Sequence, residues 1–151
     1  MKKLILSYKR KRQGKTDYKK RLALLKSNKL RFVIRKSLRN ILVQIIKYEP
    51  DGDKILISTH SNQLKKFGWK SHTGNKQSAY LTGLLCGTKA KKQNINEAIL
   101  DIGLKPSIKN SVCYAAVKGA LDAGLKIPVS EEILPKEIKS KEIDEIKNKI
   151  K

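Results

Sequence analysis

The distribution of charge constrains this chain more than any other feature of its sequence. Residues 1–48 carry seventeen Lys and Arg and a single acid, Asp17, for a net charge of +16. Residues 49–151 carry eighteen basic and twelve acidic residues, which leaves +6. Cations at this density repel one another, so the first third of the chain calls for an acidic partner. Nucleic acid is the first polyanion to consider.

The composition fits one folded domain inside the cell. A chain of 151 residues with 39% hydrophobic residues can bury one core. No apolar run approaches the roughly 20 residues of a membrane helix, and residues 4–6 are too short for a signal peptide, so we expect a cytosolic protein without a membrane partner. Cys86 and Cys113 lie alone in apolar segments, which predicts buried free thiols and no metal site or other cofactor.

The N-terminal residues are expected to form a flexible basic arm. The stretch YKRKRQGK, residues 8–15, has no periodicity and too much charge to pack on an apolar surface, so it should be disordered until phosphates bind it. Thr16 is then a candidate N-cap, with Asp17 in the first turn of a short amphipathic helix that ends near Asn28. The apolar positions of this helix are Tyr18, Leu22 and Leu25.

Three strands are predicted after this helix. Residues 30–37 alternate between two faces, residues 40–48 are rich in β-branched side chains, and residues 54–60 resume the strand pattern after a Pro-Asp-Gly-Asp turn. Strands joined by such short connections form an antiparallel meander.

The first of these strands carries cations where a core would be expected. Phe32 and Ile34 share one face of the strand. The opposite face carries Arg31, Val33 and Arg35. This second face cannot be a dry core, and we expect it to present cations, together with those at the following connection, Lys36, Arg39 and the neighbouring Asn40. A basic platform beside a basic arm suits a folded RNA, whose phosphates approach from several directions.

The second half of the chain has a different character. Residues 75–93 show a helical pattern that contains Gly83 and Gly87. Each glycine costs a helix about 1 kcal/mol relative to Ala, so we expect very close approach of this helix to the sheet as compensation. A short strand over 97–102 and a second helix over 111–123 follow.

The order of elements predicts the fold class and its divisions. Three strands, a helix, a strand and a helix indicate a single α/β domain of α+β-like order, with a mixed, largely antiparallel sheet and helices packed on it. Gly124 is the expected C′ residue of the last helix. From residue 130 on, Glu and Lys alternate, which is typical of a solvated helix or an interaction tail. We expect a basic arm at 1–15, a globular domain at 16–135 and a charged helix or tail at 136–151.

Two alternatives compete with a structural RNA-binding protein. Asp101 ends a strand, where α/β proteins often place chemistry, and Asp53 and Asp122 could join it in a two-metal nuclease site. Asp53 belongs to a turn and Asp122 to a helix end, and no motif fixes their geometry, so an enzyme is the weaker hypothesis. A free-standing regulatory RNA- or DNA-binding module would share the charge argument and differ only in its partner.

Five segments of the sequence point to a known family. They are GKTDYKKRLALLKS (14–27), RKSLRNILVQII (35–46), GWKSHTGNKQSAYLTGLLCGTKA (68–90), AILDIGL (98–104) and VKGALDAGLKIP (117–128). In sequence and order they closely resemble the archaeal L-eighteen family of large-subunit ribosomal proteins, whose eukaryotic counterpart is called L-five. The resemblance covers residues 8–135, and five motifs in register are far more specific than any single one.

The resemblance implies a non-enzymatic structural protein without a small-molecule substrate. Such proteins bind 5S rRNA, join it to the central protuberance of the cytoplasmic ribosome's large subunit, and contact large-subunit rRNA and neighbouring ribosomal proteins. Carried over to this sequence, their RNA contacts fall on Lys9, Arg10, Lys11, Arg12, Lys15, Thr16, Tyr18, Arg21, Arg35, Lys36, Ser37, Arg39 and Asn40. Arg31 on the sheet face and His60 near its basic edge complete the predicted interface.

Three positions depart from the family pattern. Leu38 stands where the family usually has Asn, Asn110 where it has Gly, and Val129 where it has His. Asn tolerates the left-handed conformation that Gly would supply, whereas Leu38 is expected to lack a polar RNA contact. The divergent C-terminal segment also puts in doubt family contacts beyond residue 130. For Tyr18, a place in the core and stacking on a base stay equally open, while a structural role is favoured for His60.

Overall fold

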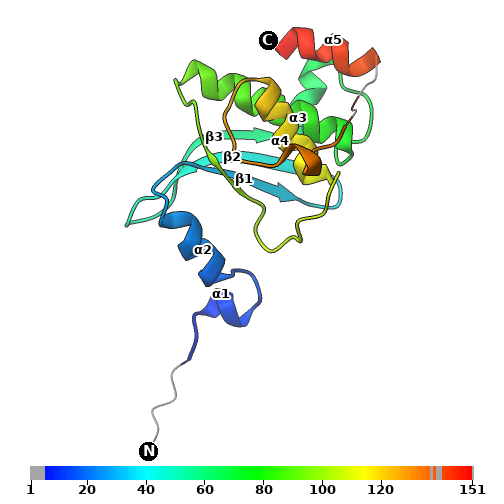
Figure 1. Ribbon diagram of the computed structural model, residues 1–151. Coiled ribbons are helices and arrows are strands. Elements are labelled where there is room, and N and C mark those ends of the chain that lie inside the picture. The colour runs from blue at the N-terminus through cyan, green and yellow to red at the C-terminus, as the bar shows by residue number, and fades with distance from the viewer. Residues whose placement is uncertain (1–5, 137, 139–140, 151) are drawn as a thin grey trace, which may run out of the picture.

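The molecule consists of a helical layer on one face of a sheet, with two short helices that extend from the sheet at the N-terminal end (Figure 1). The computed structural model describes residues 6–136, 138 and 141–150. The helices are α1 (Lys9–Arg12), α2 (Tyr18–Leu25), α3 (Lys76–Lys92), α4 (Val112–Asp122) and α5 (Lys141–Ile150), with the 3-10 helices η1 (Ser61–Phe67) and η2 (Glu131–Ile133). Among these described elements, no helix has the length and hydropathy needed to span a lipid bilayer.

The sheet is mixed, as predicted, and its strand order is β3-β2-β1-β4. β1 (Arg31–Lys36), β2 (Ile41–Lys47) and β3 (Lys54–His60) form the expected antiparallel meander. β4 (Ile99–Asp101) lies parallel to β1, with Phe32 opposite Leu100. The fold class and the order of elements predicted from the sequence are therefore confirmed.

The core lies between the sheet and the pair α3 and α4. Phe32, Ile34 and Ile45 are at most 1% exposed and share a hydrophobic cluster with Val117 of α4. Each such side chain stabilises the fold by about 1.5–3 kcal/mol when it is fully buried. This layer fixes β1 rigidly, and β1 in turn positions the basic residues at both of its ends.

The two predicted cysteine environments are confirmed. Cys86 and Cys113 are free thiols, at 0% and 7% exposure. Burial raises the pKa of Cys86 to about 12, against which Thr59 and Lys89 act only weakly. A thiol that stays protonated is a small apolar group, so Cys86 acts as core.

Glycines allow α3 to approach its neighbour closely, but that neighbour is α4. A Cβ at Gly83 would overlap the backbone carbonyl of Ala116, and one at Gly119 of α4 would overlap the carbonyl of Tyr80. The expected close approach is confirmed, and the expected partner, the sheet, was wrong. The reason is that α4 contributes its own small residues at the crossing, so both helix backbones come within contact distance.

The ends of the main helices follow the sequence signals. The Asn75 side chain accepts a hydrogen bond from the Ser78 amide at 2.7 Å, which caps the start of α3. Gly124 follows α4 with a φ of +92°, the left-handed conformation expected of a C′ residue. Asn110 has a φ of +58°, the left-handed conformation that Asn was expected to tolerate at this position.

The last helix, α5, docks on the domain through one face. Ile143, Ile146 and Ile150 are 2–6% exposed and pack in a second cluster that includes Leu81 and Leu84 of α3. Of the predicted solvated helix or interaction tail, the helix is present, but it is not fully solvated, because these isoleucines are buried. Isoleucines three and four positions apart form one stripe, which the surrounding Glu and Lys obscured.

Candidate nucleic-acid interface

The basic arm contains one turn of helix, so the expectation of disorder over 8–15 was wrong. The Tyr8 carbonyl accepts hydrogen bonds from the Lys11 and Arg12 amides at 3.0 and 3.1 Å. The Arg10 Nε also donates to Thr16 Oγ1 at 2.9 Å. These local bonds order the backbone of the turn. All five predicted cations of the arm are exposed: Lys9, Arg10, Lys11, Arg12 and Lys15.

Asp17 caps α2, and the predicted N-cap Thr16 does not. The Asp17 carboxylate accepts hydrogen bonds from the Lys19 and Lys20 amides at 3.0 and 3.1 Å. A carboxylate also interacts favourably with the positive end of the helix dipole, which a hydroxyl does not. The single acid of the first 48 residues therefore caps α2 by accepting hydrogen bonds from its backbone amides.

The apolar residues of α2 lie outside the core. Leu22 is 57% exposed, and no residue of α2 is buried, so the predicted apolar stripe is not part of the core. Tyr18 is half-buried and packs on Tyr8, with ring centroids 5.1 Å apart. A core position for Tyr18 is thus contradicted, and stacking on a base stays a prediction. The helix ends at Leu25, short of Asn28, which adopts a left-handed φ of +52°.

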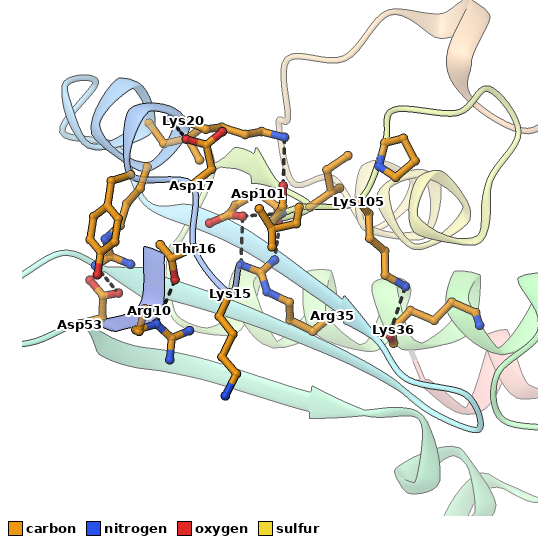
Figure 2. Close-up of a pocket in the computed structure, with 17 residues that line it drawn as sticks. Arg10, Lys15, Thr16, Asp17, Lys20, Arg35, Lys36, Asp53, Asp101 and Lys105 are labelled. Atoms are coloured by element: carbon orange, nitrogen blue, oxygen red, sulfur yellow. Dashed lines mark hydrogen bonds and ion pairs between the residues drawn. The ribbon is translucent and has the colours of Figure 1, made fainter. Parts of the chain in front are cut away.

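An Arg/Asp network of five residues, Arg21, Asp53, Arg31, Asp101 and Arg35, connects α2 to the sheet. Arg31 Nη2 lies 2.7 Å from Asp53 Oδ2, and its Nη1 lies 3.3 Å from Asp101 Oδ2. Arg21 pairs with Asp53 at 2.9 Å, and Arg35 with Asp101 at 3.0 Å (Figure 2). The charges alternate along the network, which leaves it with a net charge of +1.

Arg31 is 3% exposed, so the prediction that it presents a cation on an open sheet face was wrong. Two carboxylates from the β2–β3 turn and from β4 surround it, and neither position can be linked to Arg31 by a local pattern. The Arg35 side chain is 47% exposed and stays at the surface, as predicted. Partial burial alone would raise the pKa of Asp53, but hydrogen bonds and charge from Arg31 and Arg21 lower it below its ordinary value.

Two predicted RNA-binding residues close the β1–β2 hairpin. The Ser37 amide donates to the Asn40 carbonyl at 2.9 Å, and the Asn40 amide donates to Ser37 Oγ at 3.0 Å. Thr73 Oγ1 donates to Asn40 Oδ1 at 2.8 Å, which ties the hairpin to the loop before α3. Between them, Leu38 is 92% exposed and Arg39 is also exposed. The closed hairpin therefore fixes the backbone that carries one exposed apolar and one exposed cationic side chain.

His60 has the structural role that was favoured for it. Its Nδ1 accepts a hydrogen bond from the Asn62 amide at 3.2 Å, and it stands as the N-cap of η1. The side chain is half-buried at the end of β3. A contact with RNA through the rest of the ring stays a prediction.

Within the described residues, the three aspartates of the nuclease alternative do not gather at one site. Asp53 and Asp101 belong to the Arg/Asp network, and Asp122 accepts a hydrogen bond from the Tyr80 hydroxyl at 2.7 Å. Across the described residues, no three His, Cys, Asp or Glu side chains meet where they could hold a metal ion. Burial and the Asp122 carboxylate raise the pKa of Tyr80, so the phenol stays protonated and donates this bond.

A basic groove of about 870 Å³ lies between α2, the exposed end of β1 and the loop after β4. Lys20 Nζ donates across it to the Gly103 carbonyl at 3.0 Å, and Lys105 Nζ donates to the Lys36 carbonyl at 3.1 Å (Figure 2). Its basic lining residues are Arg10, Lys15, Lys20, Arg21, Arg35, Lys36 and Lys105. Sequence reasoning missed Lys20 and Lys105 as site residues, although Lys20 stands on the basic side of the predicted helix.

Exposed cations on an arm, a hairpin tip and a groove, set on a rigid domain whose nearby acids are already neutralised, define a nucleic-acid-binding protein. Residues 2–98 match the family model described as ribosomal large subunit proteins 60S L5 and 50S L18, and the chain belongs to this family. The large ribosomal subunit protein uL18 of Methanothermobacter thermautotrophicus is 48% identical over 132 residues, which is 87% of this chain and 69% of that protein.

Family membership confirms the predicted resemblance to archaeal-type L-eighteen proteins. The chain is a structural component of the large subunit of the cytoplasmic ribosome, with rRNA and ribosomal proteins as its partners. This family is not a class of enzymes, which removes the support for the nuclease alternative.

Proposed function

We propose that this protein binds 5S rRNA and attaches it to large-subunit rRNA in the central protuberance. The observation that carries the proposal is the placement of exposed cations near both ends of β1. The arm and α2 precede Arg31 at one end, and the hairpin tip with Arg39 follows Lys36 at the other. The groove brings cations of the arm and α2 beside Arg35 and Lys36, and the hairpin tip adds Arg39, so the basic surface is large enough to support contact with more than one RNA segment.

The cations act mainly by releasing counterions from phosphates. Each neutralised phosphate makes the logarithm of the binding constant fall by about 0.7–0.9 per tenfold increase in salt. The arm supplies five exposed cations, and the hairpin tip adds Arg39. We assign the arm to residues 1–15, the globular RNA-binding domain to 16–135 and a further, charged segment to 136–151.

The test is equilibrium binding of the full chain to 5S rRNA between about 50 and 300 mM salt, a range that spans the physiological ionic strength, where the Debye length is about 8 Å. Transfer RNA serves as a folded control of similar charge density. We expect a steep salt dependence with both RNAs, and tighter binding to 5S rRNA. Equal affinity for the two would contradict recognition of 5S rRNA. In cell extracts the protein should sediment with large subunits, whereas a mainly free pool would favour the regulatory module.

A further inference from the structure

The basic groove has apolar walls as well as cations. Leu24 of α2 lines one side of it, and Leu104 and Pro106 from the loop after β4 line the other. Leu104 is 56% exposed, so this apolar surface is accessible from solvent. The volume of about 870 Å³ falls within the range of about 300–1,000 Å³ for sites that enclose small organic groups. The groove can therefore take a flat organic group in addition to an anion.

The ammonium groups of the groove are not neutralised. Lys20, Lys36 and Lys105 donate to backbone carbonyls, at 3.0, 3.2 and 3.1 Å. Within the described part of the chain, neither these three nor Lys15 pairs with a carboxylate. The groove's own acids are occupied, because Asp53 and Asp101 are bound by arginine and Asp17 by the α2 backbone. The remaining charge favours a ligand with phosphate groups.

Arg35 provides a fixed planar surface in the groove. Its Nη1 donates to the Ile34 and Asp101 carbonyls, each at 2.9 Å, and its Nη2 donates to Asp101 Oδ1 at 3.0 Å. Three bonds in the guanidinium plane hold the group in place, while the side chain is still 47% exposed. A guanidinium held by its edges can stack on a nucleic-acid base through its face.

We propose that the basic groove receives one unstacked nucleotide of an RNA strand. Its base lies against Leu24, Leu104 and the face of Arg35, and the phosphates on either side contact the unneutralised lysines. The inference rests on the proposed function in that it takes RNA as the partner, but it does not depend on which rRNA is bound.

The test uses short strands, so that it is independent of 5S rRNA recognition. The probes are a five-nucleotide uridine strand and a strand of five abasic ribose phosphates with the same charge. Stacking of a base should make the wild-type protein bind the uridine strand about tenfold more tightly. The variant Leu24→Trp fills the groove without changing its charge and should reduce this ratio to about one. Leu22→Trp, on the exposed side of the same helix, should keep the wild-type ratio.

Three outcomes overturn the inference. Equal binding of the two strands by the wild-type protein shows that the groove takes phosphates alone. An unchanged ratio in both Leu24→Trp and Leu104→Trp, which fill the groove from opposite walls, places the base elsewhere. Uridine monophosphate that binds as tightly as the five-nucleotide strand identifies a site for free nucleotides. Circular dichroism melting checks that each variant is folded. Failure of the wild-type protein to prefer 5S rRNA contradicts the proposed function only.

Discussion

The helices α2 and α3 show how differently two parts of one chain can be used. None of the eight residues of α2 is buried, whereas eleven of the seventeen residues of α3 are. α2 is held by a cap, by the Arg21–Asp53 ion pair and by the Lys20 hydrogen bond to Gly103, and α3 by close contact with α4, the sheet and α5. The comparison predicts that RNA affinity and folding stability reside in different residues, so that each can be changed without the other.

Deletion of residues 1–15 should have the largest effect and should act on affinity alone. The arm contributes five exposed cations and buries none of its described residues. We expect affinity for 5S rRNA to fall on the order of a hundredfold to a thousandfold at 0.15 M salt, and the salt slope to fall by about 4. Filter binding measures both quantities. A slope that matches the intact protein would remove the arm from the interface, and a large drop in Tm would break the comparison.

Gly83→Ala should have the opposite effect. The added methyl group meets the Ala116 carbonyl, which belongs to the backbone of α4 and cannot rotate away. We expect a loss of about 3 kcal/mol in the free energy of unfolding, measured in urea, from overpacking at the helix crossing. Gly14→Ala is the control, because open space surrounds Gly14 and its φ of +60° costs only about 1 kcal/mol. Similar losses in the two variants would argue against the crossing as the cause.

Arg31→Met tests whether a buried cation of the basic N-terminal third contributes to folding stability. It removes the central cation and leaves Asp53 and Asp101 with one arginine each. Because these carboxylates are partly buried, we expect a loss of about 2 kcal/mol in unfolding free energy. Lys47→Met, an exposed cation on β2, should change stability by less than about 0.5 kcal/mol. If both variants were equally stable, Arg31 would contribute no more to the free energy of unfolding than an exposed surface residue does.

Arg39→Ala should weaken binding and leave stability unchanged. The side chain is exposed at the hairpin tip, while the hairpin itself is closed by Ser37 and Asn40. We expect a loss of about fivefold to tenfold in affinity for 5S rRNA and a decrease of about 0.7–0.9 in the salt slope. Lys92→Ala, at the end of α3 in the helical layer, is the charge-matched control. A thermal shift in Arg39→Ala would show a structural role instead.

The smallest effect concerns pH. The pKa of Asp53 is lowered in the folded protein, so its contribution to stability is complete above the unfolded pKa of about 3.9 and is lost as the pH falls through the folded value. The group is partly exposed, so we expect less than about 1 kcal/mol. The stability difference between wild type and Asp53→Asn in urea should therefore shrink between pH 5 and about pH 3. A constant difference would mean that the charge of Asp53 is not involved.

Local patterns predicted the elements well and the long-range ion pairs poorly. The strand meander, the helix predicted from residue 75 and the C′ residue Gly124 follow from signals within a few neighbouring residues. The burial of Arg31 depends on Asp53 and Asp101, which lie 22 and 70 residues further along the chain. The alternation of side chains along β1 could assign Arg31 to one face of the strand, but it could not show which residues cover that face.

The same limit applies to the packing partners of the helices. The glycines of α3 signalled close approach, yet the identity of the neighbour was decided by Gly119 and the alanines of α4. The cations of the arm were predicted correctly as exposed because their number alone forbids burial. The groove could not be predicted, since it forms only where α2 and the loop after β4 come together.

The docking of α5 has a consequence for the order of folding during synthesis. The stripe of Ile143, Ile146 and Ile150 covers Leu81 and Leu84 but is translated after every other described element. The outer side of α3 therefore stays exposed while the nascent chain grows, although the basic arm has already left the peptide tunnel. A newly made molecule thus passes through a stage in which its basic arm is already outside the tunnel while an apolar surface that chaperones would recognise is still exposed.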